Sequence, residues 1–68
     1  MKVEIGKEKE GYHAKISGRK NLIAFGFTKA EALEELMGVV ESELQDESEI
    51  SRIEKKIREE LLRHARDD

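Results

Sequence analysis

The sequence predicts an α+β fold, in which a three-stranded antiparallel meander is followed by two helices. Residues 1–18 alternate apolar and polar side chains with a period of two, as strands with one solvated face do. Residues 22–27 form a short apolar run, and from residue 29 onward the apolar side chains recur at helical spacing. We therefore expect the order β-β-β-α-α within one domain that covers residues 1–68.

The first two strands are expected on either side of a polar turn. Apolar side chains at every second position mark one face of each strand: Val3, Ile5, Tyr12, Ala14 and Ile16. The segment KEKEG between them is polar and ends in glycine, which is typical of a hairpin loop. A second turn is expected at GRKN, residues 18–21, because glycine and asparagine tolerate positive φ.

LIAFGF, residues 22–27, is expected to be the third strand. It is apolar on both faces, so we expect the helices to cover one face and a second subunit to cover the other. Phe25 and Phe27 share one face, and we expect them in the core rather than in a stacking platform for bases. Gly26 either lets the strand bend or lets another part of the backbone approach closely.

A capping box is expected where this strand hands over to the first helix. Thr28 precedes the helical pattern and Glu31 follows three residues later, so the Thr28 hydroxyl should accept from the N–H of Glu31 and the Glu31 carboxylate from the N–H of Thr28. The helix is expected from Lys29 to about Leu44. Gly38 is a weak point that costs about 1 kcal/mol relative to alanine unless close packing needs it. The apolar stripe comprises Leu33, Leu36, Met37, Val40 and Leu44.

The second helix is expected over about residues 49–66, after the polar break QDES. Asp46 or Ser48 should cap it. Because its apolar stripe is too long to be left exposed, it must pack on the first helix, on the sheet or on another copy of the chain. We expect the stripe to form an oligomer interface through Ile50, Ile53, Ile57 and Leu61, widened by Leu62 and Ala65.

Composition restricts the possible functions. Charged residues make up 43% of the chain, but the net charge is only −3, which argues against nonspecific binding to nucleic acid and is compatible with a basic partner. There is no cysteine, apolar signal peptide or apolar run long enough to span a membrane, so we expect a cytoplasmic protein. A domain of this size is marginally stable, which favours self-association into a dimer or larger homo-oligomer.

The sequence offers no constellation of catalytic residues, so we do not expect an enzyme, a cofactor or a metal site. His13 and Ser17 are the only base and hydroxyl close together, and an exposed strand histidine is usually only solvated. His64 suits the negative end of a helix dipole. Neighbouring helical carboxylates such as Glu34 and Glu35 point about 100° apart and do not converge on an ion.

Several short motifs occur in a characteristic order. They are Gly11-Tyr12-His13-Ala14-Lys15-Ile16 on the second strand, then Gly26-Phe27-Thr28, then Glu31-Ala32-Leu33. In this order they resemble the HicB-like antitoxin family over about half of the chain, from Tyr12 to Leu44. Here SGRKN stands in place of the family's proline and Gly-Cys elements, and a second helix in place of its fourth strand. The resemblance implies a partial ribonuclease H-like fold without that fold's metal-binding acids, in a minimal form lacking the DNA-binding module.

The resemblance also implies a function, because members of the family bind and block a small basic RNA-cleaving toxin. On this hypothesis the sheet and the first helix cover the toxin's active site, with contacts from Tyr12, His13, Lys15 and Glu34. The alternative is a self-associating structural domain with no toxin partner. In that case lysines on the first strand, Lys2, Lys7 and Lys9, would discourage open-ended pairing at that sheet edge.

Overall fold

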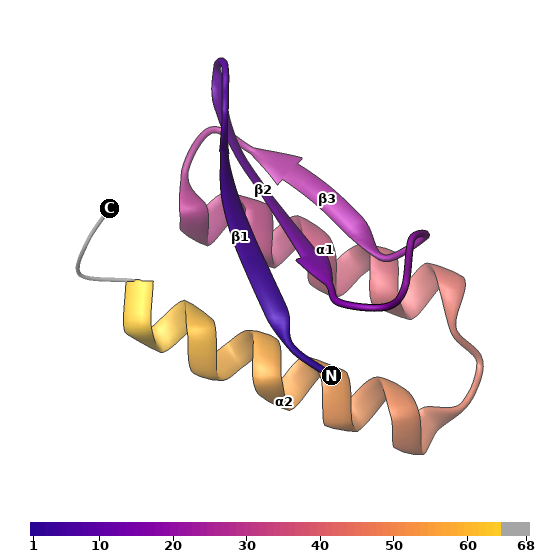
Figure 1. The fold of residues 1–68 in the computed structure, drawn as a ribbon. Helices are drawn as coiled ribbons and strands as arrows, with labels where there is room; N and C mark the ends of the chain where they lie inside the picture. Colours follow the sequence, from indigo (N-terminus) through magenta and orange to yellow (C-terminus); the bar gives the residue numbers. More distant parts are fainter. Residues whose placement is uncertain (65–68) are drawn as a thin grey trace.

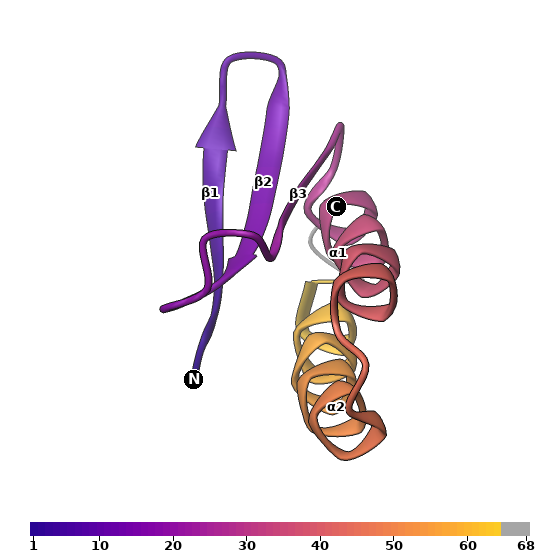
Figure 2. The same ribbon diagram turned by 90° about the vertical axis from the view of Figure 1, so that its right-hand side faces the viewer.

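The computed structural model describes residues 1–64, which form two layers (Figures 1 and 2). The strands β1 (Val3–Glu8), β2 (Gly11–Ile16) and β3 (Ile23–Gly26) make an antiparallel sheet in the order β1-β2-β3, and the helices α1 (Lys29–Glu43) and α2 (Glu47–His64) follow. Figure 2 shows both helices on one side of the sheet, so within residues 1–64 the opposite face carries no helix. The prediction of an α+β meander followed by two helices is confirmed.

The core lies between the sheet and the two helices. In the middle of the sheet, Ala14 of β2 is paired with Ile5 on one side and Ala24 on the other. Alternate residues of each strand face the helices, because strand side chains have a period of two. The fully or almost fully buried side chains are Ala14, Ile16, Leu22, Ala24, Ala32, Leu33, Leu36, Val40, Ile53 and Ile57.

Strand β3 presents its small residues to the helices and its large residues to solvent. Ala24 is 6% exposed, whereas Phe25 is 59% and Phe27 is 77% exposed. The expectation that Phe25 and Phe27 belong to the core is therefore wrong. The physical reason is the close approach of α1: a Cβ built on Gly26 would lie 2.5 Å from the Ala32 nitrogen. No side chain fits at Gly26 on that face, and the large residues Phe25 and Phe27 point to the helix-free side.

The handover from β3 to α1 contains the predicted cap, with one difference. The N–H of Glu31 donates to Thr28 Oγ1 at 3.0 Å, as expected of a capping box. The Glu31 carboxylate accepts from the N–H of Phe27 at 2.8 Å, one residue before the predicted donor. It therefore anchors the end of the strand to the first turn of the helix.

The break between the helices follows the predicted polar segment. Helix α1 ends at Glu43, and the N–H of Leu44 donates to the Val40 carbonyl at 3.1 Å. Asp46 caps α2, because its Oδ1 accepts from the N–H of Ser48 at 2.9 Å and from the N–H of Glu49 at 3.4 Å. Helix α2 therefore starts two residues earlier than expected, at Glu47; the predicted end at residue 66 lies outside the described residues.

The apolar stripe of α2 is used within the chain. Ile53 and Ile57 are completely buried, and Ile50 and Leu61 pack against the same core. This corrects the assignment of Ile53 and Ile57 to an oligomer interface, because side chains inside a monomer core have no surface to offer. Leu62 is 78% exposed and does not widen the stripe, while Ala65 lies outside the described residues.

Candidate functional site

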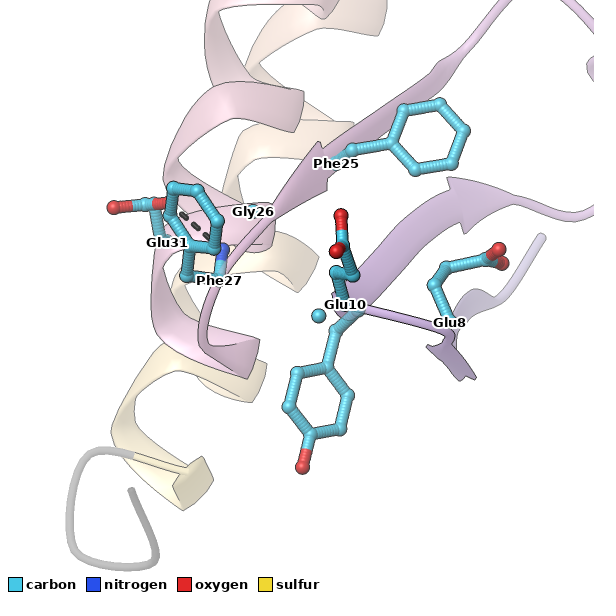
Figure 3. Close-up of a pocket in the computed structure, with 8 residues that line it drawn as sticks. Glu8, Glu10, Phe25, Gly26, Phe27 and Glu31 are labelled. Atoms are coloured by element: carbon cyan, nitrogen blue, oxygen red, sulfur yellow. Dashed lines mark hydrogen bonds between the residues drawn. The ribbon is translucent and has the colours of Figure 1, made fainter.

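A shallow groove of about 320 Å³ lies at one end of the sheet, where the β1–β2 turn meets the handover from β3 to α1 (Figure 3). We call it the aromatic groove, because three of its side chains carry rings. Its lining residues are Glu8, Glu10, Gly11, Tyr12, Phe25, Gly26, Phe27 and Glu31. The groove combines apolar rings with carboxylates at the end of the sheet, next to the first turn of α1.

The rings of the aromatic groove come from two strands and the segment after β3. Phe25 and Phe27 are largely exposed, and the His13 ring meets Phe25 edge-on with centroids 6.3 Å apart. The Tyr12 ring lies under two cations of its own chain: the Lys7 Nζ is 4.7 Å and the Lys29 Nζ is 5.7 Å from its centroid. Aromatic faces attract cations through their quadrupole, so these rings suit a basic ligand.

The three carboxylates of the groove differ in what they bind. Glu8 pairs with Nδ1 of His13, and Glu31 accepts from the N–H of Phe27. Glu10, at the tip of the β1–β2 turn, makes no hydrogen bond or ion pair with the described residues. Figure 3 shows Glu10 between Glu8 and the two phenylalanines. This end of the sheet therefore carries one uncompensated carboxylate, Glu10, together with the Lys7 and Lys29 ammonium groups over Tyr12.

The four predicted contact residues do not form one surface. Tyr12 lines the aromatic groove, and His13 touches one of the groove residues, Phe25. Lys15 lies further along β2, where its Nζ is 3.8 Å from Glu4 Oε1. Glu34 lies on α1 beside Arg58 and Leu61 of α2, in the helical layer. Tyr12 and His13 therefore lie near the same end of the sheet but on its opposite faces, with Tyr12 packed against the core, and Glu34 lies at a separate site.

Of the eight residues that line the groove, sequence reasoning named only Tyr12 as a contact, and the omission of Phe25, Phe27 and Glu10 matters most. Phe25 and Phe27 were expected in the core, and Glu10 was treated only as part of a polar turn. The signal for the phenylalanines lies in Ala24 and Gly26: small residues at alternate positions indicate the face against which a helix packs closely. No sequence signal marks Glu10, because its position in the groove depends on where the hairpin meets the β3–α1 segment.

His13 and Ser17, the base and hydroxyl that lie close together in the sequence, are not brought together by the fold. The Ser17 hydroxyl accepts from the N–H of Lys2 at 2.9 Å, and Ser17 lies four residues along from His13, so this histidine and serine do not form a catalytic pair. Within residues 1–64, no group of three or more acidic or histidine side chains could hold a metal ion. None of the helices in this part of the chain is long and apolar enough to cross a membrane.

Comparisons with known proteins do not point to a function: no family model, curated protein or solved structure matches this chain. The residues that carry the resemblance to HicB-like antitoxins lie on β2 and at the β3–α1 handover. Several of them line the aromatic groove, including Tyr12, Gly26 and Glu31.

Proposed function

We propose that this chain is an antitoxin-like protein-binding domain, which neutralises a small basic RNA-cleaving toxin in the cytoplasm by covering its active site. The observation that carries the proposal is the aromatic groove, where the exposed rings of Phe25 and Phe27 lie beside carboxylates. Large exposed apolar side chains with a polar rim are typical of protein interaction sites. The resemblance to HicB-like antitoxins supplies the identity of the partner class.

The overall charge of the chain favours a basic partner. Glu10 is uncompensated, and the whole chain carries a net charge of −3. Opposite charges on two proteins accelerate their encounter and orient them, although they add less to the final affinity. Because Lys7 and Lys29 of the chain itself already occupy the Tyr12 ring, lysine or arginine side chains of the partner would use the exposed rings of Phe25 and Phe27.

Inhibition on this proposal is steric, and the chain performs no reaction. The rings of Phe25 and Phe27 supply the buried centre of the interface, and the carboxylates around them supply its polar rim. Aromatic anchors at the centre of an interface cost about 2 kcal/mol or more when truncated, which is about a 30-fold loss of affinity. Phe25 is the better anchor to test, because it lies on the strand and contacts His13.

The test is co-expression with the product of the neighbouring gene, followed by copurification and an RNA-cleavage assay. A small basic RNA-cleaving protein should copurify and lose its activity in the complex. Phe25→Ala should weaken the complex about 30-fold. Leu62→Ala is the matched control, because Leu62 is also a large exposed apolar residue but lies on α2 beside Leu61 and Glu34. A neighbouring product that fails to bind, or a complex unaffected by Phe25→Ala, would count against the proposal.

A second candidate is a self-associating domain without a toxin partner. The observation in its favour is Leu62, which is 78% exposed beside Ala30 and Leu61 in a shallow apolar groove between α1 and α2. A second copy of the chain could cover this groove and form a homodimer. Light scattering coupled to size-exclusion chromatography tests this reading: a dimer that Leu62→Glu dissociates would support it, and a monomer at micromolar concentration would remove it.

A further inference from the structure

We propose that the outer edge of β3 binds an extended segment of the partner as a fourth strand, in which apolar and basic residues alternate. This inference rests on the proposed function, because it takes the partner to be basic, and it adds how the partner is held. Four features carry it: the unpaired main chain of β3, the absence of charge on this edge, the exposed side chains of Ile23 and Phe25, and a row of carboxylates on α1.

The main chain of β3 is open on its outer side. The N–H of Ile16 donates to the Leu22 carbonyl at 3.0 Å, so the peptide groups of Leu22 face β2. Because main-chain groups alternate in direction along a strand, those of Ile23 and Phe25 face away from β2. Among residues 1–64, no hydrogen bond is found for these outward groups. Strand β3 therefore presents donors and acceptors at the spacing that another strand needs.

The two edges of the sheet differ in their protection. At β1, Lys2, Lys7 and Lys9 lie on or beside the strand, and lysine is a residue that discourages edge pairing. Strand β3, with the sequence IAFG, has no charged residue. The N–H of Phe27, just after the strand, donates to the Glu31 carboxylate, so the unpaired edge of β3 ends at Gly26. Of the two edges, β3 is the one that can accept a strand.

The helix-free face of the sheet indicates which residue type is favoured at every second position of the added strand. Ile23 is 36% and Phe25 is 59% exposed on this face. Residues of the incoming strand that lie opposite them point to the same side of the sheet, because paired residues share a face. Apolar residues at these positions would cover both side chains.

The other half of the side chains would meet what we call the carboxylate ridge, formed by Glu31, Glu35 and Glu43 with Val39 among them. These positions are four residues apart, so they form one row along α1. The two ends of the row are fixed beside β3, because Glu31 binds the N–H of Phe27 and Glu43 Oε1 lies 3.4 Å from Asn21 Nδ2. The row therefore runs along the outer side of β3.

The opposite side of α1 confirms this orientation of the ridge. Ala30 and Glu34 lie beside α2, and α2 in turn lies toward β1, at the far edge of the sheet. Incoming side chains that point toward the helical layer would meet the carboxylate ridge, which favours lysine or arginine. A second copy of this chain at the same edge would instead bring two carboxylate ridges together, so the charges select a basic partner over self-pairing.

A short synthetic peptide tests the edge directly. The probe is a seven-residue peptide of alternating lysine and valine, and the matched control replaces each lysine with glutamate. The readout is amide hydrogen exchange of Ile23 and Phe25 in the ¹⁵N-labelled chain. We expect the lysine peptide to slow exchange at both amides at least ~10-fold, since strand pairing would occupy these N–H groups. No protection, or equal protection by the glutamate peptide, would overturn the inference.

Variants test the same edge in the complex with the copurifying partner. Ile23→Pro removes an outward N–H at the first position of the strand, where proline is tolerated, and Ile23→Val is its control. Glu35→Lys reverses a charge of the carboxylate ridge, and Glu41→Lys makes the same change at an exposed position of α1 outside that row. We expect Ile23→Pro and Glu35→Lys to weaken the complex at least ~10-fold, and the controls to leave it within ~2-fold.

The results separate this inference from the proposed function. If the basic partner binds but neither Ile23→Pro nor Glu35→Lys weakens it, the edge is not the binding site and the proposed function stands. If no basic protein binds the wild-type chain, the proposed function fails, and the peptide experiment still decides whether the edge accepts a basic strand. Circular dichroism of Ile23→Pro checks that the fold is retained, and Glu35→Lys gives an independent reading on an exposed helix position.

Discussion

Replacing Gly26 with alanine should destabilise the fold, whereas the same change at Gly38 should stabilise it. Both substitutions add one methyl group, so the difference between their effects on the free energy of unfolding reports how much room each site has. A Cβ on Gly26 would lie 2.5 Å from the nitrogen of Ala32, 2.8 Å from the carbonyl carbon of Glu31 and 2.9 Å from its Cβ. A Cβ on Gly38 would have no neighbouring atom within 4 Å, apart from the backbone of its own helix turn.

The magnitudes follow from these distances. Optimal contacts between heavy atoms are about 3.5–4.0 Å, so β3 and α1 would have to separate by about 1 Å to admit a methyl group at Gly26. Overpacking of this kind costs about 1–3 kcal/mol, and we expect the upper end because the nearest obstacle is backbone. Alanine in place of glycine inside an exposed helix gains about 1 kcal/mol, which is the expectation for Gly38.

Urea unfolding followed by circular dichroism measures both effects. With a slope of about 1 kcal/mol per molar urea for a chain of this size, Gly26→Ala should lower the midpoint by about 3 M and Gly38→Ala should raise it by about 1 M. If Gly26→Ala is too unstable to measure alone, it can be measured in the Gly38→Ala background. A Gly26→Ala variant within 0.5 kcal/mol of wild type, an estimate of ordinary surface effects, would refute the close approach of β3 and α1.

Three further predictions concern the cap, the second helix and the sheet. Thr28→Ala should lower the free energy of unfolding by about 1 kcal/mol, while Thr28→Ser should retain it, as urea unfolding would show. Ile57→Ala should cost about 3 kcal/mol and Leu62→Ala less than about 0.5 kcal/mol; equal losses would contradict the packing of α2. Gly6→Ala should displace the ring of His13, because a Cβ there would lie 2.8 Å from Nε2; an unchanged ring signal in NMR would argue against this packing.

The order and boundaries of the elements could be predicted because local signals agree with the fold. The alternation in residues 1–18 gave two strands, and the pair Thr28 and Glu31 located the start of α1 to the residue. The polar segment around Asp46 separated the helices, although Asp46 itself, rather than Ser48, accepts the capping hydrogen bonds. These hydrogen bonds join residues that are close together in the chain, so the sequence alone is enough to predict them.

The candidate site could not be predicted to the same degree, because it depends on how the layers meet. Phe25 and Ala24 are both apolar, so periodicity alone does not say which of them faces the helices. The answer comes from the close approach of α1 to β3 at Gly26, where no side chain fits. The burial of α2 could not be predicted for the same reason. The apolar stripe with Ile53 and Ile57 had to pack against some surface, and only the folded chain shows that this surface is the core of the same chain.

The β1-β2-β3 order also has a kinetic consequence. Each strand pairs with its neighbour in the chain, across a two-residue turn between β1 and β2 and a six-residue connection between β2 and β3. The sheet can therefore form from segments that are adjacent in the chain, and the helices then pack on it in sequence order. Since folding slows as the average separation of contacting residues grows, this chain should refold in a single phase on the order of milliseconds or faster.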